Sequence, residues 1–520
     1  MASLNSVSDK GIIQRLRSND PTLTFLAIMP SGDAEADNFS VDEIHSFRLP
    51  ELIHQFLDGC ILNVSFVSAL AFHGICHPSF LQNWPCGEFC EVLANNSVLT
   101  SLVIERVQLD EEEGRKLGRS LAANFTLLIL DINQFKAGGG WVAGLADGLA
   151  GGSALKSIVL DRVELGEDCW KRFGVALSVN TSLTSLTLSH CRIESMGGAE
   201  IGHGLSNNSV LTKLSLSGNK IKVEGGAKIG EAFVDNSTLT FPKLRSNQTG
   251  NGVTTIAEAL VVNSTLTTLD LQWNKIREGE AEKLAKAMAV NSSLTNLVLS
   301  NNPIGASGVK MIVESLAVNS TLLSLHLSSV RIGDIGGANF AEALSRNSTL
   351  TKLDLQMNQF GDAGAKCIGE SLAANSTITA LDLSLNQIAD DGGEKIGSAI
   401  AVNSSLIILN ISFNKIGDIG GAKIGEGLGL NSTLTHLDLA NNWIGDDAAA
   451  KILEGLAFNP TLTELRIDCF PILLDHLLYR SETNSKLKSA SLFELLLPSL
   501  RKSSSAESSI GVVGMASSVC

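Results

Sequence analysis

The sequence predicts an α/β solenoid in which short strands and helices alternate through a stack of repeats. Three observations support this fold class: a recurring turn, an alternation of apolar residues after each turn, and apolar residues at helical spacing after that. Of the thirteen intervals between successive turns, twelve are 28 residues long and one is 27. The turns begin at Asn96, Asn124, Gly152, Asn180, Asn208, Asn236, Asn263, Asn291, Asn319, Asn347, Asn375, Asn403, Asn431 and Asn459.

The repeat at 431–458 shows each predicted element in order. An alternating apolar stretch that starts at Leu434 predicts a strand with one buried face. Apolar residues at helical spacing, from Ala448 to Leu456, predict the helix. The Asn-Ser-Thr turn suits a chain reversal, because Asn tolerates left-handed geometry and its amide can bond nearby backbone groups. Small residues at the helix start are expected to keep the helix close to the sheet.

A single repeat cannot bury its own apolar face, so neighbouring repeats must stack. Parallel strands lie about 4.8 Å apart, whereas packed helices need roughly 8–10 Å. The helix side of the stack is therefore the longer side, and the stack is expected to curve with a concave parallel sheet and convex helices. The concave face of such a sheet is open to solvent, which is unusual for parallel strands.

The pattern L-x-x-L-x-L-x-x-N, followed by a G-x-x-x-I-G-x-x-L helix, resembles leucine-rich repeats of the ribonuclease-inhibitor class. Its uniform 28-residue form is similar to the repeat region of NOD-like receptors and, more loosely, to that of Ran GTPase-activating protein. The resemblance implies a leucine-rich-repeat solenoid, or horseshoe. The strict alternation of two repeat types found in ribonuclease inhibitors is absent.

Flanking segments are expected around the repeats. The N-terminal segment contains two degenerate copies, at 23–28 and 67–72, and the C-terminal segment reads as one or two amphipathic helices followed by a Ser-rich tail. The predicted organisation is therefore an N-terminal cap at 1–95, about fourteen repeats at 96–470, a helical cap at 471–502 and a disordered tail at 503–520.

The resemblance also implies a buried Asn in the loop after each strand, whose amide bonds loop backbone. This Asn is matched by Asn219, Asn247, Asn274, Asn302, Asn358, Asn386, Asn414 and Asn442, with Cys191 as the family's other common choice. Val107, Phe135, Val163, Val330 and Phe470 depart from the pattern. Pro242 falls inside the strand of the one shortened repeat, where we expect a local defect or bend.

Composition excludes several classes of function. Lys and Arg total 39 against 54 Asp and Glu, a net charge of −15, which argues against a nucleic-acid partner. The N-terminus lacks the apolar run of a secretory signal, and polar residues interrupt the most apolar stretch, 60–77, so no membrane segment is expected. Nine scattered Cys fit reduced thiols. We expect a cytoplasmic monomer.

Short motifs have structural readings that outweigh chemical ones. The chain contains no GxxxxGK[ST], and the GxGxxA match at 138–143 lies in the frame where other repeats use small residues for packing, so no cofactor is expected. A Cys/His group near the N-terminus invites a zinc reading, but its spacing matches no standard site and packing is favoured. The Asn-Ser-Thr sequons are read as turns. The Cys/His group is His73, Cys76, His77, Cys86 and Cys90.

The concave face is the best candidate for a functional site. Counted from the strand start, the third, fifth and seventh residues of each repeat point to that face, and the eighth lies just beyond. Acidic residues at the fifth position stand beside apolar residues at the eighth, as in a protein-binding groove. Because Asp is frequent at this position in the family, part of the set could equally be solvated sheet residues. The candidates are Asp270, Trp273, His326, Asp354, Met357, Asp382, Leu385, Phe413, His436 and Asp438.

The earlier repeats carry a different lining. Basic residues at the same face predict a concave surface that is basic early and acidic late, with scattered surface charge as the alternative. These basic residues are Arg106, Arg162, Lys213, Lys243 and Arg245.

The sequence therefore favours a non-enzymatic scaffold or regulator that binds an unidentified protein in the concave face, with Trp273 and Phe413 as anchors. The alternative is a GTPase-activating protein for a small GTPase, similar to the Ran regulator. That family typically carries a strongly acidic C-terminal run, whereas this chain ends in Ser-rich sequence. An innate-immune or ubiquitin-ligase adaptor would need a further module.

Overall fold

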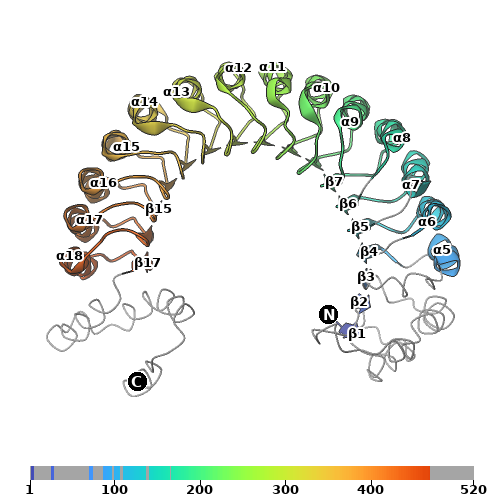
Figure 1. Cartoon of the computed structure of the whole chain (residues 1–520), viewed down its shortest axis with the longest axis horizontal. Coiled ribbons are helices and arrows are strands. Elements are labelled where there is room, and N and C mark those ends of the chain that lie inside the picture. The colour runs from blue at the N-terminus through green and yellow to red at the C-terminus, as the bar shows by residue number, and fades with distance from the viewer. Residues whose placement is uncertain are drawn as a thin grey trace. The chain divides into compact units, whose positions relative to one another are not determined.

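The computed structural model describes residues 2–4, 25–28, 69–73, 86–96, 99–105, 109–135, 140–163 and 165–468. The chain divides into two compact units, Met1–Lys275 and Ile276–Cys520. Within each unit the strands run parallel on the inner side of an arc and the helices lie on its outer side (Figure 1). The predicted fold class, a leucine-rich-repeat solenoid with an open parallel sheet, is confirmed.

In the first unit, each strand pairs with the strand of the preceding repeat, and among the described residues a helix follows each strand from β3 to β9. The strands are β1 (Ala2–Leu4), β2 (Phe25–Ile28), β3 (Ala69–His73), β4 (Ser101–Glu105), β5 (Ile129–Asn133), β6 (Ser157–Asp161), β7 (Ser185–Ser189), β8 (Lys213–Ser215), β9 (Phe241–Lys243) and β10 (Thr268–Asp270). The helices are α5 (Cys86–Asn95), α6 (Glu111–Ala123), α7 (Gly140–Ala150), α8 (Glu167–Val179), α9 (Ser195–Asn207), α10 (Lys222–Asp235) and α11 (Val253–Val262).

In the second unit, helices and strands alternate without interruption, and the strands again pair in parallel with the register of one repeat. The strands are β11 (Asn296–Val298), β12 (Ser324–His326), β13 (Lys352–Asp354), β14 (Ala380–Asp382), β15 (Ile408–Asn410), β16 (His436–Asp438) and β17 (Glu464–Arg466). The helices are α12 (Glu278–Met288), α13 (Gly305–Leu316), α14 (Gly333–Arg346), α15 (Asp362–Ala374), α16 (Asp390–Val402), α17 (Asp418–Leu430) and α18 (Asp446–Leu456).

The two periodicities of the sequence build the core between sheet and helices. In β14 the central Leu381 is 2% exposed, while Ala380 and Asp382 on either side of it are half-buried on the open face. The following helix α16 buries Ile396 and Ile400. Every repeat therefore contributes one apolar strand face and one apolar helix face to a continuous core.

The turn Asn of each repeat fastens that repeat to the preceding one. The Nδ2 of Asn403 donates to the carbonyls of Leu372 (2.7 Å) and Asn375 (2.9 Å), and its Oδ1 accepts from the amides of Ser405 (3.0 Å) and Leu406 (2.7 Å). Its backbone is extended, with φ −73° and ψ 133°. Asn403 therefore does not use the left-handed geometry that Asn tolerates, and its amide bonds neighbouring backbone groups as expected.

The same arrangement recurs along both units, with the carbonyls provided by residues 31 and 28 positions earlier in most repeats. At the one turn that carries glycine, Gly152, φ is +90°, the left-handed geometry that a Cβ disfavours. The Asn residues whose Nδ2 reaches the preceding repeat are Asn124, Asn180, Asn208, Asn236, Asn263, Asn319, Asn347, Asn375, Asn403, Asn431 and Asn459.

The loop Asn forms a second ladder, as the resemblance implies. The Nδ2 of Asn386 donates to Leu355 O (3.2 Å), and its Oδ1 accepts from the amides of Asn358 (2.9 Å) and Phe360 (3.1 Å). Where the loop Asn is replaced, the side chain joins the core: Phe135, Val163 and Val330 are at most 1% exposed. Val107 and Phe470 lie outside the described residues.

The expected defect at Pro242 reduces the pairing of β9 with β10 and leaves its pairing with β8 intact. Strand β9 keeps three residue pairs with β8, including Leu214 with Pro242, but pairs with β10 only through Lys243 and Asp270. A short 3₁₀ helix, η2 (Gly250–Gly252), leads directly into α11, and these 3 and 10 residues together are one fewer than the 14 residues of α10 in the preceding repeat.

The structure describes only short segments of the predicted N-terminal cap and none of the predicted C-terminal cap. Strands β2 and β3 coincide with the two degenerate repeats, and β1 is a further strand that the sequence reading missed. The predicted C-terminal helical cap and tail lie outside the described residues. Within the part of the chain that the structure describes, no helix is long and apolar enough to cross a membrane.

The small residues of the helices serve contact between neighbouring helices more than contact with the sheet. A Cβ built on Gly425 of α17 would lie 2.6 Å from the backbone nitrogen of Ile452 in α18, and one on Gly397 of α16 would lie 2.6 Å from that of Ile424 in α17. These distances leave no room for a methyl group, so glycine sets how closely successive helices approach.

Gly425→Ala is expected to destabilise the second unit by about 1–3 kcal/mol, because its methyl group meets backbone on α18. The matched control is Gly279→Ala in α12, where nothing lies within 4 Å of the added Cβ. That change should be neutral or stabilising by up to about 1 kcal/mol. Urea unfolding followed by circular dichroism measures both, and equal effects of the two substitutions would contradict this account of helix spacing.

Adjacent asparagines in the first unit test the turn ladder. Asn208 is 3% exposed and its Oδ1 accepts from the amides of Val210 (3.1 Å) and Leu211 (2.7 Å), whereas Asn207 is exposed and makes only a 3.5 Å bond to His203 O. Asn208→Ala leaves buried backbone groups without partners and should cost about 2–4 kcal/mol. Asn207→Ala should change the unfolding free energy by less than about 0.5 kcal/mol.

Candidate functional site

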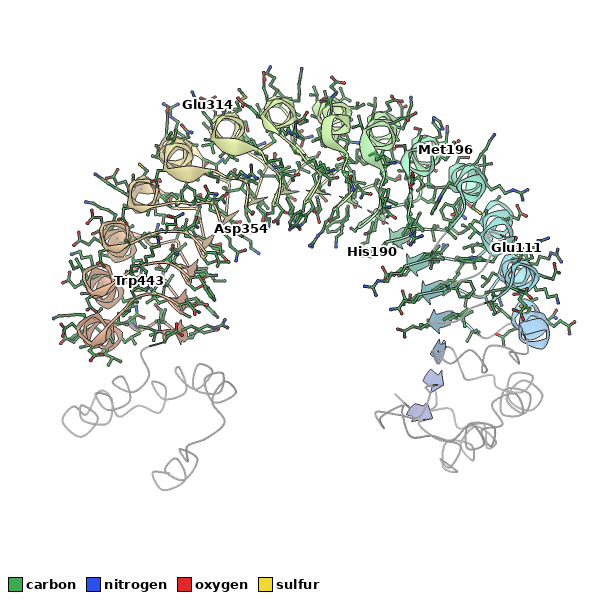
Figure 2. All side chains as sticks on the ribbon, viewed as in Figure 1. Glu111, His190, Met196, Glu314, Asp354 and Trp443 are labelled. Atoms are coloured by element: carbon green, nitrogen blue, oxygen red, sulfur yellow. The ribbon has the colours of Figure 1, made fainter. Side chains whose placement is uncertain are left out.

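The fifth positions of the second unit form one row across the inner face of the sheet, on strands β12 to β17. The parallel register pairs Asp354 with Asp382, Asp382 with Asn410, and Asn410 with Asp438. We call these four residues the acid ladder. Figure 2 shows Asp354 on the inner, strand side of its unit, whereas Glu314 lies on the outer helices. His326 precedes the acid ladder on β12 and Arg466 follows it on β17.

One carboxylate or amide oxygen of each ladder residue supports the turn that follows the strand. The Oδ1 of Asp382 accepts from the amide of Ser384 at 2.8 Å, and the Oδ1 of Asp438 accepts from the amide of Ala440 at 3.0 Å. Asp354 and Asn410 do the same two residues ahead. This Asx-type bond explains why Asp and Asn recur at the fifth position, and it leaves Oδ2 for other partners.

Asp354 is the best-compensated carboxylate of the acid ladder. Its Oδ2 lies 3.4 Å from His326 Nδ1 and accepts a short hydrogen bond from Ser328 Oγ. Burial by itself would raise the pKa of Asp354, but the hydrogen bonds from His326, Ser328 and the Gln356 backbone outweigh it and lower that pKa. Asp354 is therefore held as the anion.

Asp382 has only neutral partners. Its Oδ1 accepts from Ser384 Oγ (2.6 Å), and its Oδ2 accepts from Asn410 Nδ2 (2.9 Å). Burial raises the pKa of Asp382, and the nearby Asp354 anion adds to that effect. The pKa of Asp438 is raised as well, chiefly by burial, although Arg466 lies 3.7 Å from its Oδ2. The centre of the acid ladder thus carries negative charge without a cation beside it.

The eighth positions form a parallel row of exposed apolar side chains. Met357, Leu385 and Phe413 are 57%, 43% and 51% exposed. Each has left-handed backbone, with φ of 57°, 56° and 53°. We call these three residues the apolar stripe. The eighth position has positive φ in the other described repeats too, where it is held by Gly218, Asn301 and Asn441, which tolerate this geometry better, and by Gln134, Arg162, His190, Ser246, Trp273 and Ser329.

His436 lies at the third position of β16 rather than in the acid ladder. Its Nε2 is 3.5 Å from Glu464 Oε2, and its Nδ1 is 2.7 Å from Thr435 Oγ1. Ala380 and Ile408 precede it at the third positions of β14 and β15. The acid ladder therefore has apolar neighbours on both sides, and Ile408 is 45% exposed.

The remaining two candidates, Asp270 and Trp273, belong to the first unit. Trp273 is 52% exposed with φ 59°, so it resembles the apolar stripe in conformation. The Oδ1 of Asp270 accepts from the amide of Gln272 at 3.0 Å, the same Asx-type bond as in the acid ladder. The structure therefore places these two residues on a different unit from the other eight.

The predicted basic early lining is wrong as a general description of the first unit. Acidic residues share its inner face, and Asp161 pairs with His190 (2.9 Å) and lies near Arg162 (3.8 Å). Burial raises the pKa of Asp131 there. Lys213, Lys243 and Arg245 are exposed, Arg162 is exposed beside Asp161, and Arg106 lies outside the described residues.

Packing accounts for the short motifs within the described residues. Gly140 of the GxGxxA match begins α7, and its amide donates to Glu111 Oε1 at 3.1 Å. Cys86 begins α5 and Cys90 of the same helix is buried, as the packing reading predicts. Cys76 and His77 lie outside the described residues, and in the rest no cluster of three or more metal-ligating side chains occurs.

Sequence reasoning missed the residues that set the charges of the acid ladder. Ser328 and Ser384, at the seventh position of their repeats, donate hydrogen bonds to Asp354 and Asp382. Arg466 lies beside Asp438 at the end of the acid ladder. The 28-residue period could have identified these neighbours, because residues 28 positions apart lie side by side on adjacent parallel strands. Asn410, which donates to Asp382 and is paired in register with Asp438, belongs to the same row.

Comparison with known proteins agrees with this geometry. Nine segments match a family model described as a leucine-rich repeat: 179–202, 207–230, 262–284, 290–313, 318–341, 346–369, 374–397, 402–425 and 430–453. This region of the chain is therefore built from leucine-rich repeats. The ribonuclease-inhibitor and NOD-like subtypes are not distinguished by that match. No curated protein matches the sequence.

Two solved structures illustrate the range of similar folds. An internalin (inlF) from Listeria monocytogenes is 18% identical with a TM-score of 0.42, covering 74% of this chain and 96% of its own. The leiomodin-1 actin-binding site 2 structure is also 18% identical, with a TM-score of 0.25, covering 39% of this chain and 97% of its own.

The opposite pKa shifts of Asp354 and Asp382 are measurable. We expect Asp354 to titrate below its ordinary value of 3.8 and Asp382 above it. Ionised Asp354 then stabilises the fold above that value, and the stabilisation is lost as pH falls through the lowered pKa. The contribution of Asp382 is present at low pH and lost as pH rises through the raised pKa. Carboxyl ¹³C NMR, assigned with Asp354→Asn and Asp382→Asn, checks the order; the reverse order would contradict this assignment of charges.

Proposed function

We propose that the inner face of the second unit is a non-enzymatic protein-binding site, and that the chain is a scaffold or regulator. Stacked repeats commonly use such extended faces to hold another protein. The apolar stripe would supply the central contact, and the acid ladder would supply the charged flank. The matched leucine-rich repeats support this class of function.

The observation that carries the proposal is the exposure of three apolar side chains at a position whose backbone is left-handed along the repeats. Met357, Leu385 and Phe413 occupy left-handed backbone in three consecutive repeats, at a cost of about 1 kcal/mol each. About half of each side chain stays in water, so burial within the fold offsets little of that cost. A partner that covers these side chains would offset it.

A GTPase-activating role has less support. Neither the matched repeats nor the two similar structures favour that activity. Protein binding is therefore the function that we develop. The same inner face would serve a partner of any enzymatic class, because the fold does not determine the partner.

Replacing the apolar stripe by Asn separates binding from folding. In the triple variant Met357→Asn/Leu385→Asn/Phe413→Asn, Asn suits the left-handed backbone, so the unfolding free energy should stay equal or rise by about 1–2 kcal/mol. Partners captured by the full-length wild type and identified by mass spectrometry should be lost. Binding is then remeasured with each purified partner.

The matched control changes apolar residues of similar exposure outside the inner face. Leu430, the last residue of α17, and Phe458, which follows α18, are each 74% exposed. The double variant Leu430→Asn/Phe458→Asn should retain the partners. If the triple variant keeps the same partners with unchanged affinity, the inner face of the second unit is not the binding site.

A further inference from the structure

The acid ladder and the apolar stripe together constrain the chemistry of a partner. Both rows run across consecutive parallel strands, so each strand presents one ladder residue and, from β13 to β15, one apolar side chain. Strands of a parallel sheet are spaced about 4.8 Å apart, so the four ladder residues span about 14 Å. A partner that contacts both rows must therefore lie across the strands, along the stack.

The acid ladder is negatively charged, and basic side chains lie near both of its ends. Asp382 at its centre has only neutral hydrogen-bond partners, and Asp438 has Arg466 at 3.7 Å. His326 lies beyond one end on β12, Arg466 beyond the other on β17, and exposed Lys352 stands at the third position of β13. Among the described residues, the ladder carboxylate without a cationic partner is therefore Asp382 on β14, whereas Asp438 on β16 shares Arg466 with Glu464, and a cationic group would find its strongest attraction near Asp382.

The apolar neighbours make the surface unsuitable for a purely charged ligand. Ile408 is 45% exposed on one side of the acid ladder, and Phe413 is 51% exposed on the other. A partner with basic residues on one line and apolar residues on the flanking lines matches this arrangement. A nucleic acid or an anionic membrane would bring like charge to the acid ladder and is disfavoured.

The spacing between strands favours a helix over an extended peptide. Three turns of an α-helix advance about 16 Å, close to the 14 Å of the ladder, and residues at i, i+4, i+7 and i+11 share one face. In an extended strand, residues on one face repeat about every 6.7 Å, so four of them span about 20 Å. The residue spacing of an extended peptide therefore no longer matches the spacing of the ladder residues after two strands.

We propose that the partner surface seated on β13 to β16 is an amphipathic α-helix whose Lys or Arg residues face Asp382 and Asp438 and whose apolar residues cover Leu385 and Phe413. This inference rests on the proposed function, since it names the chemistry of the partner for that same face. The basic residues would supply charge to the uncompensated carboxylate, and the apolar residues would remove the apolar stripe from water.

Synthetic peptides of equal length provide the test, with the full-length protein and fluorescence anisotropy; the first, second and fourth also share one composition. The first peptide is helical with Lys at i, i+4, i+7 and i+11 and Leu on the flanking lines. The second has its Lys residues spread around the helix, the third has Glu in place of Lys, and the fourth alternates Lys with other residues to favour an extended chain. We expect the first peptide to bind roughly tenfold more tightly than each of the others, a difference of about 1.4 kcal/mol.

Charge-removing variants locate the contact. Asp382→Asn and Asp438→Asn should each weaken the first peptide by roughly tenfold, as expected for loss of a charged hydrogen-bond partner. The control Glu314→Gln, on α13 at the outer side (Figure 2), should leave its affinity unchanged. Thermal melts of each variant show whether the fold is retained, and binding is compared only between folded variants.

The results separate this inference from the proposed function. Equal binding of the four peptides, no binding of the first, tighter binding of the extended peptide, or equal effects of Asp382→Asn and Glu314→Gln would each overturn the helix assignment. If the apolar-stripe variant still loses its captured partners, the proposed function survives that failure. If the first peptide prevails and depends on Asp382, the chemistry of the partner is established.

Discussion

The solenoid depends on one side-chain amide per repeat. The turn Asn donates two hydrogen bonds to carbonyls of the preceding repeat and accepts two from its own backbone, as Asn403 shows. Buried backbone groups at the helix ends and strand starts are thereby paired. The same bonds recur through both units, and Asn263 keeps them after the one 27-residue interval, with Phe233 O and Asn236 O as acceptors.

Because other positions hold the stack together, the residues of the inner face can vary in sequence. The Leu residues on the buried side of each strand and the two Asn ladders hold the stack, whereas the third, fifth and eighth positions contribute little to the core. The apolar stripe uses that freedom at a conformational cost, since Phe413 stands where Asn441 stands one repeat later. The acid ladder has a mixed role: Oδ1 of Asp382 supports its own turn, and the same carboxylate lies on the open inner face of the sheet.

The sequence was sufficient for the fold and for the location of the candidate site. Leucines at alternating positions and the turn Asn specify strand, helix and stacking, because these depend on local patterns that repeat. The backbone of the turn Asn could not be predicted, since Asn suits both left-handed and extended geometry, and its bonds to the preceding repeat decided the outcome. The left-handed backbone at Met357 and Phe413 could not be predicted from the sequence either, because those residue types disfavour it. The pKa of Asp382 is raised chiefly by burial, and its neighbours Asp354 and Asn410 are distant in sequence and adjacent in the sheet.

The turn ladder also decides what can happen to the Asn-x-Ser/Thr tripeptides. Attachment of a sugar requires access to Nδ2, and in Asn403 that nitrogen is buried and donates to two carbonyls at once. A glycan on it would have to displace the neighbouring coil of the chain. Folding and N-glycosylation at Asn403 are therefore mutually exclusive outcomes, and the first to occur excludes the second.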